Sequence, residues 1–291
     1  MVCGVVCGVV WCVLCCGVLW CALASLCGRW NDRSFGKQLC DLVWMLSCRE
    51  GVRSRVQPSA APAILLSLLR VATAVTAQLS EGGATTAATE EGVSSTHRQL
   101  RQAVTALVNL APASRDDWLC ESSAAGLLAT LLDTSTGTIM EPLSALFFNS
   151  CQTPGVAVQV ARARNFQRLC GAYRSGRLTP GGVTNVARLF HCFSQLPRSV
   201  IPHLMRRCDD GQPPVLHAMV AMCAPSNAST HDLMPAVIEA LNAINKFADH
   251  GALVSNGVLL RDLLVQGGAV TNCVYHTRAI TTGKPYGSVM N

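Results

Sequence analysis

Apolar side chains recur at the spacing of an α-helix through most of the chain, and this periodicity constrains the fold most. From Pro62 onward the 291-residue sequence reads as one amphipathic helix after another, separated by short turns. Among them are one helix expected at about residues 155–174 and another that begins at Pro180, with Thr179 as its N-cap. Strict alternation of apolar and polar residues, the pattern of a half-buried strand, is scarce. Since 50% of the residues are hydrophobic, the helices have ample material for a core. The sequence therefore predicts an all-α protein.

Four of the expected helices resemble one another, which indicates an internal repeat. When Ala106, Ala145, Ala187 and Ala240 are aligned, the spacings between them are 39, 42 and 53 residues. Repeats of about this length are typical of helical arrays in which each unit packs on the next. We therefore expect an α-solenoid of helical-hairpin repeats. A non-repetitive helical bundle is the alternative.

Two stretches resemble known repeat families. Residues 104–133 are similar to an armadillo unit, with an Ala-Leu-x-Asn-Leu helix, a loop and a Leu-Leu helix. Residues 178–208 resemble the octotricopeptide and heptatricopeptide (RAP-associated) repeats of organellar proteins. The matching positions are Leu178, Thr179, Pro180, Asn185, Ala187, Phe190, Ile201 and Leu204. The second resemblance implies RNA binding, and the first implies a groove for an extended peptide.

Positive charge is concentrated in one part of the chain. Residues 142–208 hold nine arginines and no acidic residue, in a protein whose net charge is +6. Such a field favours a polyanion, and aromatic side chains within it stack on unpaired bases. We expect an arginine stripe on the concave side that binds single-stranded RNA, with Phe166 and Tyr173 as base-stacking candidates. The stripe would comprise Arg162, Arg164, Arg168, Arg174, Arg177, Arg188, Arg206 and Arg207.

Two other interpretations of this block stay open: an acidic or extended peptide partner, or a solvated surface without a specific partner. Catalytic signatures are missing from the sequence, including the P-loop, HExxH and GxSxG patterns. We therefore expect no enzyme activity, no catalytic residues, no bound metal and no cofactor. The first hypothesis is a mitochondrial RNA-binding or RNA-processing factor. The alternative is an armadillo-like protein–protein adaptor.

Residues 1–44 form an apolar, cysteine-rich segment with two interpretations. Residues 1–28 carry no charged side chain and are long enough to span a bilayer, and Arg29, Arg33 and Lys37 follow them. An anchor over residues 2–28 would then leave the rest of the chain facing the cytosol. Alternatively, residues 2–20 use only amino acids that codons of G and T encode, which indicates a translated tract upstream of the true start.

The remaining chain divides into three expected parts. Residues 45–96 begin at Met45 and are rich in Arg and Ser and poor in acid near their start. This pattern is typical of a mitochondrial transit peptide, if translation starts at Met45, or of a basic linker. Residues 45–96 also contain a first helix expected over residues 62–79 and a linker over residues 80–95, after which Thr96 is expected to cap the next helix. Residues 97–270 are the expected repeat domain, and residues 271–291 the expected C-terminal tail.

Overall fold

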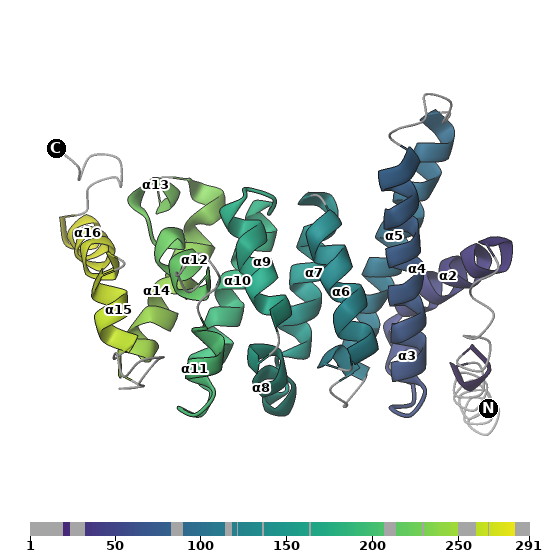
Figure 1. The fold of residues 1–291 in the computed structure, drawn as a ribbon, viewed down its shortest axis with the longest axis horizontal. Coiled ribbons are helices and arrows are strands. Elements are labelled where there is room, and N and C mark those ends of the chain that lie inside the picture. Colours follow the sequence, from purple (N-terminus) through teal and green to yellow (C-terminus); the bar gives the residue numbers. More distant parts are fainter. Residues whose placement is uncertain are drawn as a thin grey trace, which may run out of the picture. The chain divides into compact units, whose positions relative to one another are not determined.

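The computed structural model confirms the all-α class. Among the residues that it describes there are helices and turns and no strand (Figure 1). The chain divides into two compact units, Met1–Ser135 and Thr136–Asn291. The described residues are 20–23, 33–82, 90–113, 118–120, 122–135, 137–162, 164–206, 214–228, 230–249, 260–266 and 268–282.

The first unit is built around two long helices, α4 and α5, which pack along each other (Figure 1). Helix α2 lies beside α5, and α6 lies beside α4. Their buried faces are aliphatic, with Leu65 and Leu69 of α4 and Leu107 of α5 fully enclosed. The helices are α2 (Arg33–Ser47), α3 (Glu50–Arg53), α4 (Ala61–Gly82), α5 (Glu90–Leu110) and α6 (Ser122–Thr134), with 3-10 turns η2 (Ala111–Ala113) and η3 (Trp118–Cys120).

Helix α4 agrees with the apolar run expected from Pro62 to Leu79, but α5 begins earlier than expected. The sequence places an N-cap at Thr96 after a linker, whereas α5 starts at Glu90. Residues 61–79 are also the one described stretch that is long and apolar enough to cross a membrane. Half of that window is buried against neighbouring helices, as in a core helix. If residues 45–96 were cleaved off as a transit peptide, the first unit would lose α4 and its buried side chains.

Of the uncharged residues 1–28, the structure describes only residues 20–23. There the indole Nε1 of Trp20 donates a hydrogen bond to the carbonyl oxygen of Val52 at 3.1 Å, and the Trp20 and Leu23 side chains are buried. The predicted membrane span over residues 2–28 and the tract over residues 2–20 therefore lie mostly outside the described residues, whereas Met45, the predicted alternative start, lies in α2. Both stay predictions.

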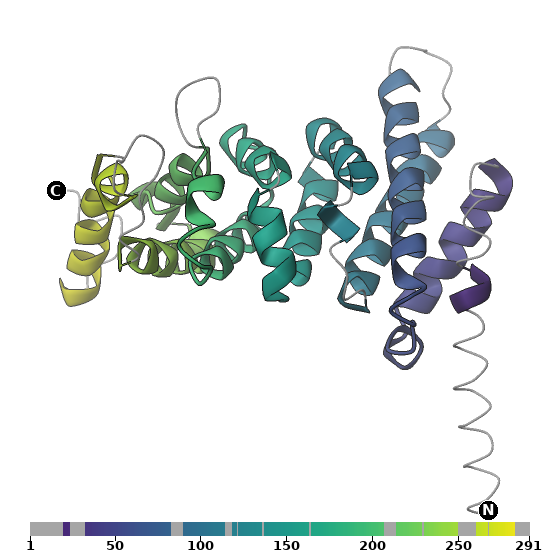
Figure 2. The same ribbon diagram turned by 60° about the horizontal axis from the view of Figure 1, so that its bottom comes forward.

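The second unit arranges its helices in two layers (Figures 1 and 2). Helices α7, α10 and α14 lie side by side in one layer, and α9 packs beside α12 in the other. The helices are α7 (Gly137–Ser150), α8 (Pro154–Arg162), α9 (Arg164–Arg174), α10 (Pro180–Phe193), α11 (Ile201–Leu204), α12 (Pro214–Met222), α13 (Pro225–Ala228), η4 (His231–Leu233), α14 (Met234–Asp249), α15 (Leu260–Gln266) and α16 (Ala269–Thr282).

A cluster of three phenylalanines joins the two layers. The ring of Phe166 on α9 meets the rings of Phe190 and Phe193 on α10 edge to face, with centroids 5.7 and 4.6 Å apart. All three side chains are fully buried. Edge-to-face pairs add to the free energy gained from burial itself, so this cluster fixes how α9 and α10 face each other.

The turn between α9 and α10 is specified locally. Gly176 has φ +69°, the left-handed conformation that favours glycine at a helix end, and the N–H of Arg177 donates to the carbonyl oxygen of Ala172 at 3.0 Å. Thr179 then caps α10, because its hydroxyl accepts from the N–H of Gly182 at 3.2 Å. With Pro180 in the first turn, this confirms the predicted helix start.

One type of polar contact recurs between neighbouring helices of a layer. In the first unit the Asn109 amide on α5 donates to the hydroxyl of Ser47 on α2 at 3.3 Å. In the second unit the Asn185 amide on α10 donates to the hydroxyl of Ser144 on α7 at 3.1 Å. Both serines are buried and both asparagines are partly buried, and buried hydroxyls need such partners, so these pairs help to fix which helices are neighbours.

The units differ from the expected domain boundaries. The expected repeat domain, residues 97–270, is divided at Ser135, because α5 and α6 pack on α4 within the first unit. The expected tail, residues 271–291, is helical as far as Thr282, since α16 packs on α13 and α15. Residues 283–291 lie outside the described part.

Candidate binding surfaces

Two exposed arginines share one face of α9, which we call the α9 face. Arg164 and Arg168 are four residues apart and both are exposed. Each lies two residues from the buried Phe166, which at about 100° per residue places it about 160° around the helix from that ring. The α9 face therefore points away from α10.

Arg188 lies on the opposite layer. It is exposed on α10 and is two residues from the buried Phe190, so it also lies on the far side of its own helix. Because Phe166 and Phe190 face each other, Arg188 points away from the α9 face. The prediction of one arginine stripe is therefore wrong for these residues: the phenylalanine cluster separates them into two surfaces.

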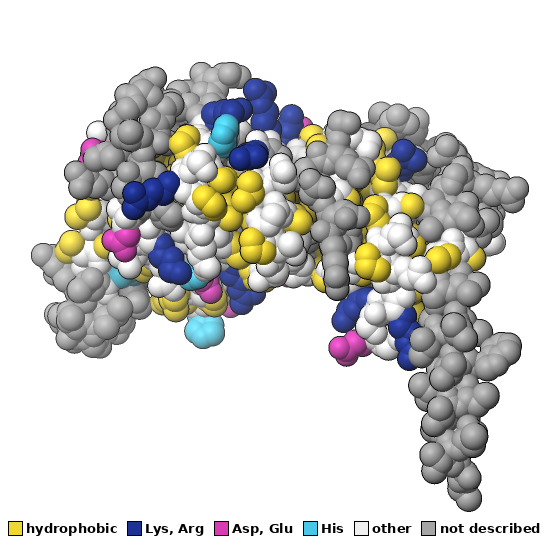
Figure 3. Space-filling model, turned by 90° about the horizontal axis from the view of Figure 1, so that it is seen from below, with side chains coloured by type: hydrophobic (Ala, Val, Ile, Leu, Met, Phe, Trp, Pro, Cys, Tyr) yellow, Lys and Arg dark blue, Asp and Glu magenta, His cyan; other side chains and the backbone are white. Residues whose placement is uncertain are grey.

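The other predicted arginines come from further elements. Arg162 is exposed at the end of α8, and Arg174 is exposed at the end of α9. Arg177 is partly buried after α9, where its Nε donates to the Ser175 hydroxyl at 3.1 Å. Arg206 follows α11 with one guanidinium nitrogen 3.1 Å from Nδ1 of His203, and Arg207 lies outside the described residues. Figure 3 shows the Lys and Arg side chains of one face in separate groups, with apolar and acidic side chains between them.

Neither predicted stacking residue presents an open ring. Phe166 is 1% exposed inside the phenylalanine cluster, so a base cannot reach it, and the prediction is wrong for this residue. Tyr173 is partly buried, and its hydroxyl lies 3.5 Å from the amide nitrogen of Asn227. Burial raises the pKa of the Tyr173 phenol, which is the effect expected when the charged form loses water.

A groove of about 570 Å³ opens on the other layer, and we call it the α10 groove. Its walls come from α7 and the turn after it, from α8, from α10 and from α14. The lining combines apolar side chains, amides and charges of both signs. The lining residues are Phe148, Cys151, Gln152, Pro154, Ala157, Arg188, His191, Cys192, Gln195, Leu196, Glu239 and Asn242.

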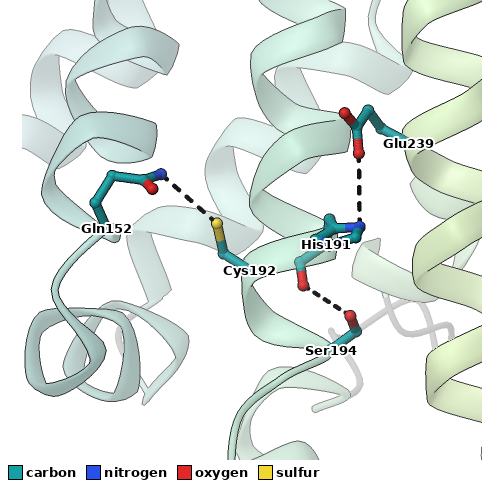
Figure 4. A network of polar contacts seen from close by, with 5 residues as sticks. All are labelled: Gln152, His191, Cys192, Ser194 and Glu239. Carbon is teal, nitrogen blue, oxygen red and sulfur yellow. Dashed lines mark hydrogen bonds and ion pairs between the residues drawn. The ribbon is translucent and has the colours of Figure 1, made fainter.

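Figure 4 shows how α10 connects the two sides of this groove. On one side the Gln152 amide donates to the Cys192 sulfur at 3.8 Å. On the other side Nδ1 of His191 lies 3.5 Å from a carboxylate oxygen of Glu239 on α14. Adjacent residues of α10 thus reach towards the turn after α7 on one side and towards α14 on the other.

A thiol, an imidazole and a carboxylate in one groove invite comparison with a nucleophile and its base. The contacts do not make that arrangement, because Cys192 is paired with Gln152, and His191 with Glu239. Burial raises the pKa of the Cys192 thiol, with smaller effects from its neighbours, so the thiolate is disfavoured. An activated cysteine needs the opposite shift. The arrangement suits binding through hydrogen bonds and charge.

Sequence reasoning missed this groove because its residues are far apart in the chain and chemically ordinary. Gln152, Gln195 and Asn242 come from three segments, and none belongs to a motif. The signal present in the sequence was the alignment of Ala145, Ala187 and Ala240. Those alanines lie on α7, α10 and α14, the three helices that stand side by side.

No protein-family model, curated protein or solved structure matches the chain. The function must therefore be argued from the residues and their geometry.

Proposed function

We propose that this protein is a non-catalytic helical-repeat scaffold that binds an extended peptide along the α10 groove. The observation that carries the proposal is the lining of the groove. Amide side chains from three segments, Gln152, Gln195 and Asn242, stand beside apolar side chains in one hollow. An extended peptide presents unpaired N–H and C=O groups along its length, and side-chain amides such as Gln195 and Asn242 can donate to and accept from them. The Gln152 nitrogen already donates to the Phe148 carbonyl oxygen at 3.2 Å and to the Cys192 sulfur at 3.8 Å, so Gln152 offers its oxygen as an acceptor.

The repeat character of the scaffold is part of this proposal. It is supported by the row of α7, α10 and α14 and by the pair of α2 and α5, in each of which an Asn amide bonds to a Ser hydroxyl on the neighbouring helix. A row of neighbouring helices presents a wall, and such walls are the binding surfaces of helical-repeat proteins.

Single-stranded RNA is the second candidate ligand, and one observation favours it. Arg164 and Arg168 stand together on the α9 face, and the sequence from residue 142 to 208 contains no acidic residue. Two arginines neutralise two phosphates, so the contact would contribute about 1.4 to the slope of log affinity against log salt. The α10 groove suits RNA less well, because among its described lining residues Arg188 is the one arginine or lysine, whereas RNA carries a phosphate at every nucleotide.

The test begins with a phage-displayed library of random twelve-residue peptides that is panned on the full chain. A selected peptide is then synthesised with a fluorophore, and its binding is measured by fluorescence anisotropy. Asn242 is an exposed residue of the groove wall, so Asn242→Trp should obstruct the groove and weaken binding at least tenfold. Arg168→Trp on the α9 face is the matched control and should leave peptide binding unchanged.

Labelled poly(U) RNA is titrated against the same proteins over a range of salt concentrations. The second candidate would be established if the double substitution Arg164→Gln and Arg168→Gln weakens RNA binding and Asn242→Trp does not. If no peptide is selected, or if Asn242→Trp binds the selected peptide as tightly as the wild type, the peptide-binding function is wrong. Mitochondrial localisation stays a prediction and does not depend on this outcome.

A further inference from the structure

The ligand of the α10 groove has an identifiable chemistry because one cation in the groove is held in place. The guanidinium carbon of Arg188 lies 5.7 Å from the ring centroid of Phe148, over the ring. A guanidinium over an aromatic face is held by a cation–π interaction, and its N–H donors point outward in the plane of the group. Such a fork matches the two oxygens of a carboxylate.

The other charges of the groove leave Arg188 as the available cation. Glu239 lies 3.5 Å from Nδ1 of His191, and it is the only acidic side chain that lines the groove among the described residues. Within the same part of the chain, the structure gives Arg188 no ion pair. An exposed arginine that stacks on a ring and has no acidic partner is placed to pair with an acid of the ligand.

A second hollow of about 580 Å³ adjoins the first and shares Gln195 and Leu196 with it. Its charged side chains are Arg198, Lys246 and Asp249, two basic and one acidic. Five helical residues lead from Arg188 to Phe193, where α10 ends, and the second hollow begins at Ser194. At 1.5 Å per helical residue this is about 8 Å, so a side chain about three positions along an extended peptide passes the end of α10 and reaches the second hollow.

From these positions we infer that the α10 groove binds an acidic extended peptide. One carboxylate pairs with Arg188 over Phe148, and a second, about three residues along the peptide, lies near Arg198 and Lys246. The inference rests on the proposed function, since it names the partner of the same groove. Amide side chains between the two basic positions would hold the intervening backbone.

The test uses the peptides that the full chain selects from the displayed library. We expect them to share two Asp or Glu residues about three positions apart. Replacing either acid with its amide should weaken binding about tenfold, as expected for the loss of one charge-assisted contact. Arg188→Gln should weaken binding of the original peptide by the same factor. It should cause no further loss of affinity for a peptide in which the acid that pairs with Arg188 has already been replaced by its amide.

Arg164→Gln on the α9 face is the matched control and should leave binding unchanged. Arg188→Lys keeps the charge without the fork and should recover only part of the affinity. Thermal unfolding of each variant, followed by circular dichroism, separates lost binding from lost folding, because Arg188 is exposed and its substitution should leave the fold intact.

The inference is overturned, and the peptide-binding function kept, if the selected peptides lack acidic residues or tolerate Arg188→Gln while Asn242→Trp still blocks them. Equal losses for Arg164→Gln and Arg188→Gln would also overturn it, since a general positive field would then explain the binding. If the chain selects no peptide at all, both proposals fail. If poly(U) RNA competes with the peptide, and Arg188→Gln abolishes this competition, the site binds nucleic acid instead.

Discussion

The α9 face and the α10 groove lie on opposite sides of the same phenylalanine cluster, and they differ in chemistry. The α9 face presents Arg164 and Arg168, whereas the α10 groove mixes Arg188 with Glu239, amides and apolar side chains. Both draw their arginines from a stretch of sequence that has one sign of charge. A stretch of sequence rich in one charge therefore need not form one charged surface. The packing of α9 against α10 places the arginines of residues 142–208 on two different surfaces.

Removing Phe166 should have the largest effect, because its ring separates the two surfaces. We expect Phe166→Ala to lower the free energy of unfolding by about 3–5 kcal/mol, the cost of emptying a buried aromatic site. Urea denaturation followed by circular dichroism measures this loss.

The matched control is Arg164→Ala, an exposed change on the same helix that should alter stability by less than about 0.5 kcal/mol. A loss below about 1 kcal/mol for Phe166→Ala would mean that the ring is not in the core. The two surfaces would then not be held apart as described.

Alkaline pH tests the packing of the layer that contains α9. Cys223 directly follows α12, the helix that packs beside α9, and its thiol is buried. Burial, and to a lesser extent the nearby Cys273, raises the pKa of Cys223 from 9.0 to about 12. Between pH 9 and 12 the unfolded chain releases this proton while the folded chain keeps it, so stability is retained below pH 9 and lost as the pH rises towards 12. The loss is about 1.4 kcal/mol per pH unit for one group.

Cys223→Ala removes this titration, so its stability should fall less steeply with pH than that of the wild type. Urea denaturation under reducing conditions at pH 8.5 and 10.5 compares the two slopes. Cys40 on α2, whose pKa burial and Asp41 raise to about 12, gives the parallel variant in the first unit. Identical slopes for Cys223→Ala and the wild type would show that this thiol is not buried.

The smallest expected effect concerns the hydrogen bond between Asn185 and Ser144, which joins α10 to α7 beside the groove. Asn185→Ala should cost about 1 kcal/mol, the net value of a typical hydrogen bond within a protein. A double-mutant cycle with Ser144→Ala measures the coupling between the two side chains directly. Independent effects of the two substitutions would indicate that α7 and α10 are not aligned as described.

Local signals predicted helix ends well where the sequence contains capping residues and proline. Thr179 and Pro180 define the start of α10 because capping and a fixed φ act within one turn. The prediction failed at Thr96, since α5 begins at Glu90 and a capping pattern inside a helix looks the same as one at its end. It also failed to divide residues 155–174, which the structure separates into α8 and α9.

For the candidate site, the sequence predicted some of the residues but not their arrangement. The sequence supplied the arginines, and Arg188 does line the groove, but Phe166 was assigned to a ligand and proves to be core. A phenylalanine at helical spacing is equally suited to either role, because periodicity identifies a face without saying what covers it. The amides of the groove carry no sequence signal, since their role depends on which helices are neighbours.

By itself the sequence determined that this protein is helical, since apolar spacing, caps and turn residues act over a few positions along the chain. It also determined that one stretch carries arginine without acid. The tertiary structure alone decided where those arginines point. Burial of the rings of Phe166, Phe190 and Phe193 against one another fixes the rotation of α9 and α10, and each exposed side chain follows from the rotation of its helix.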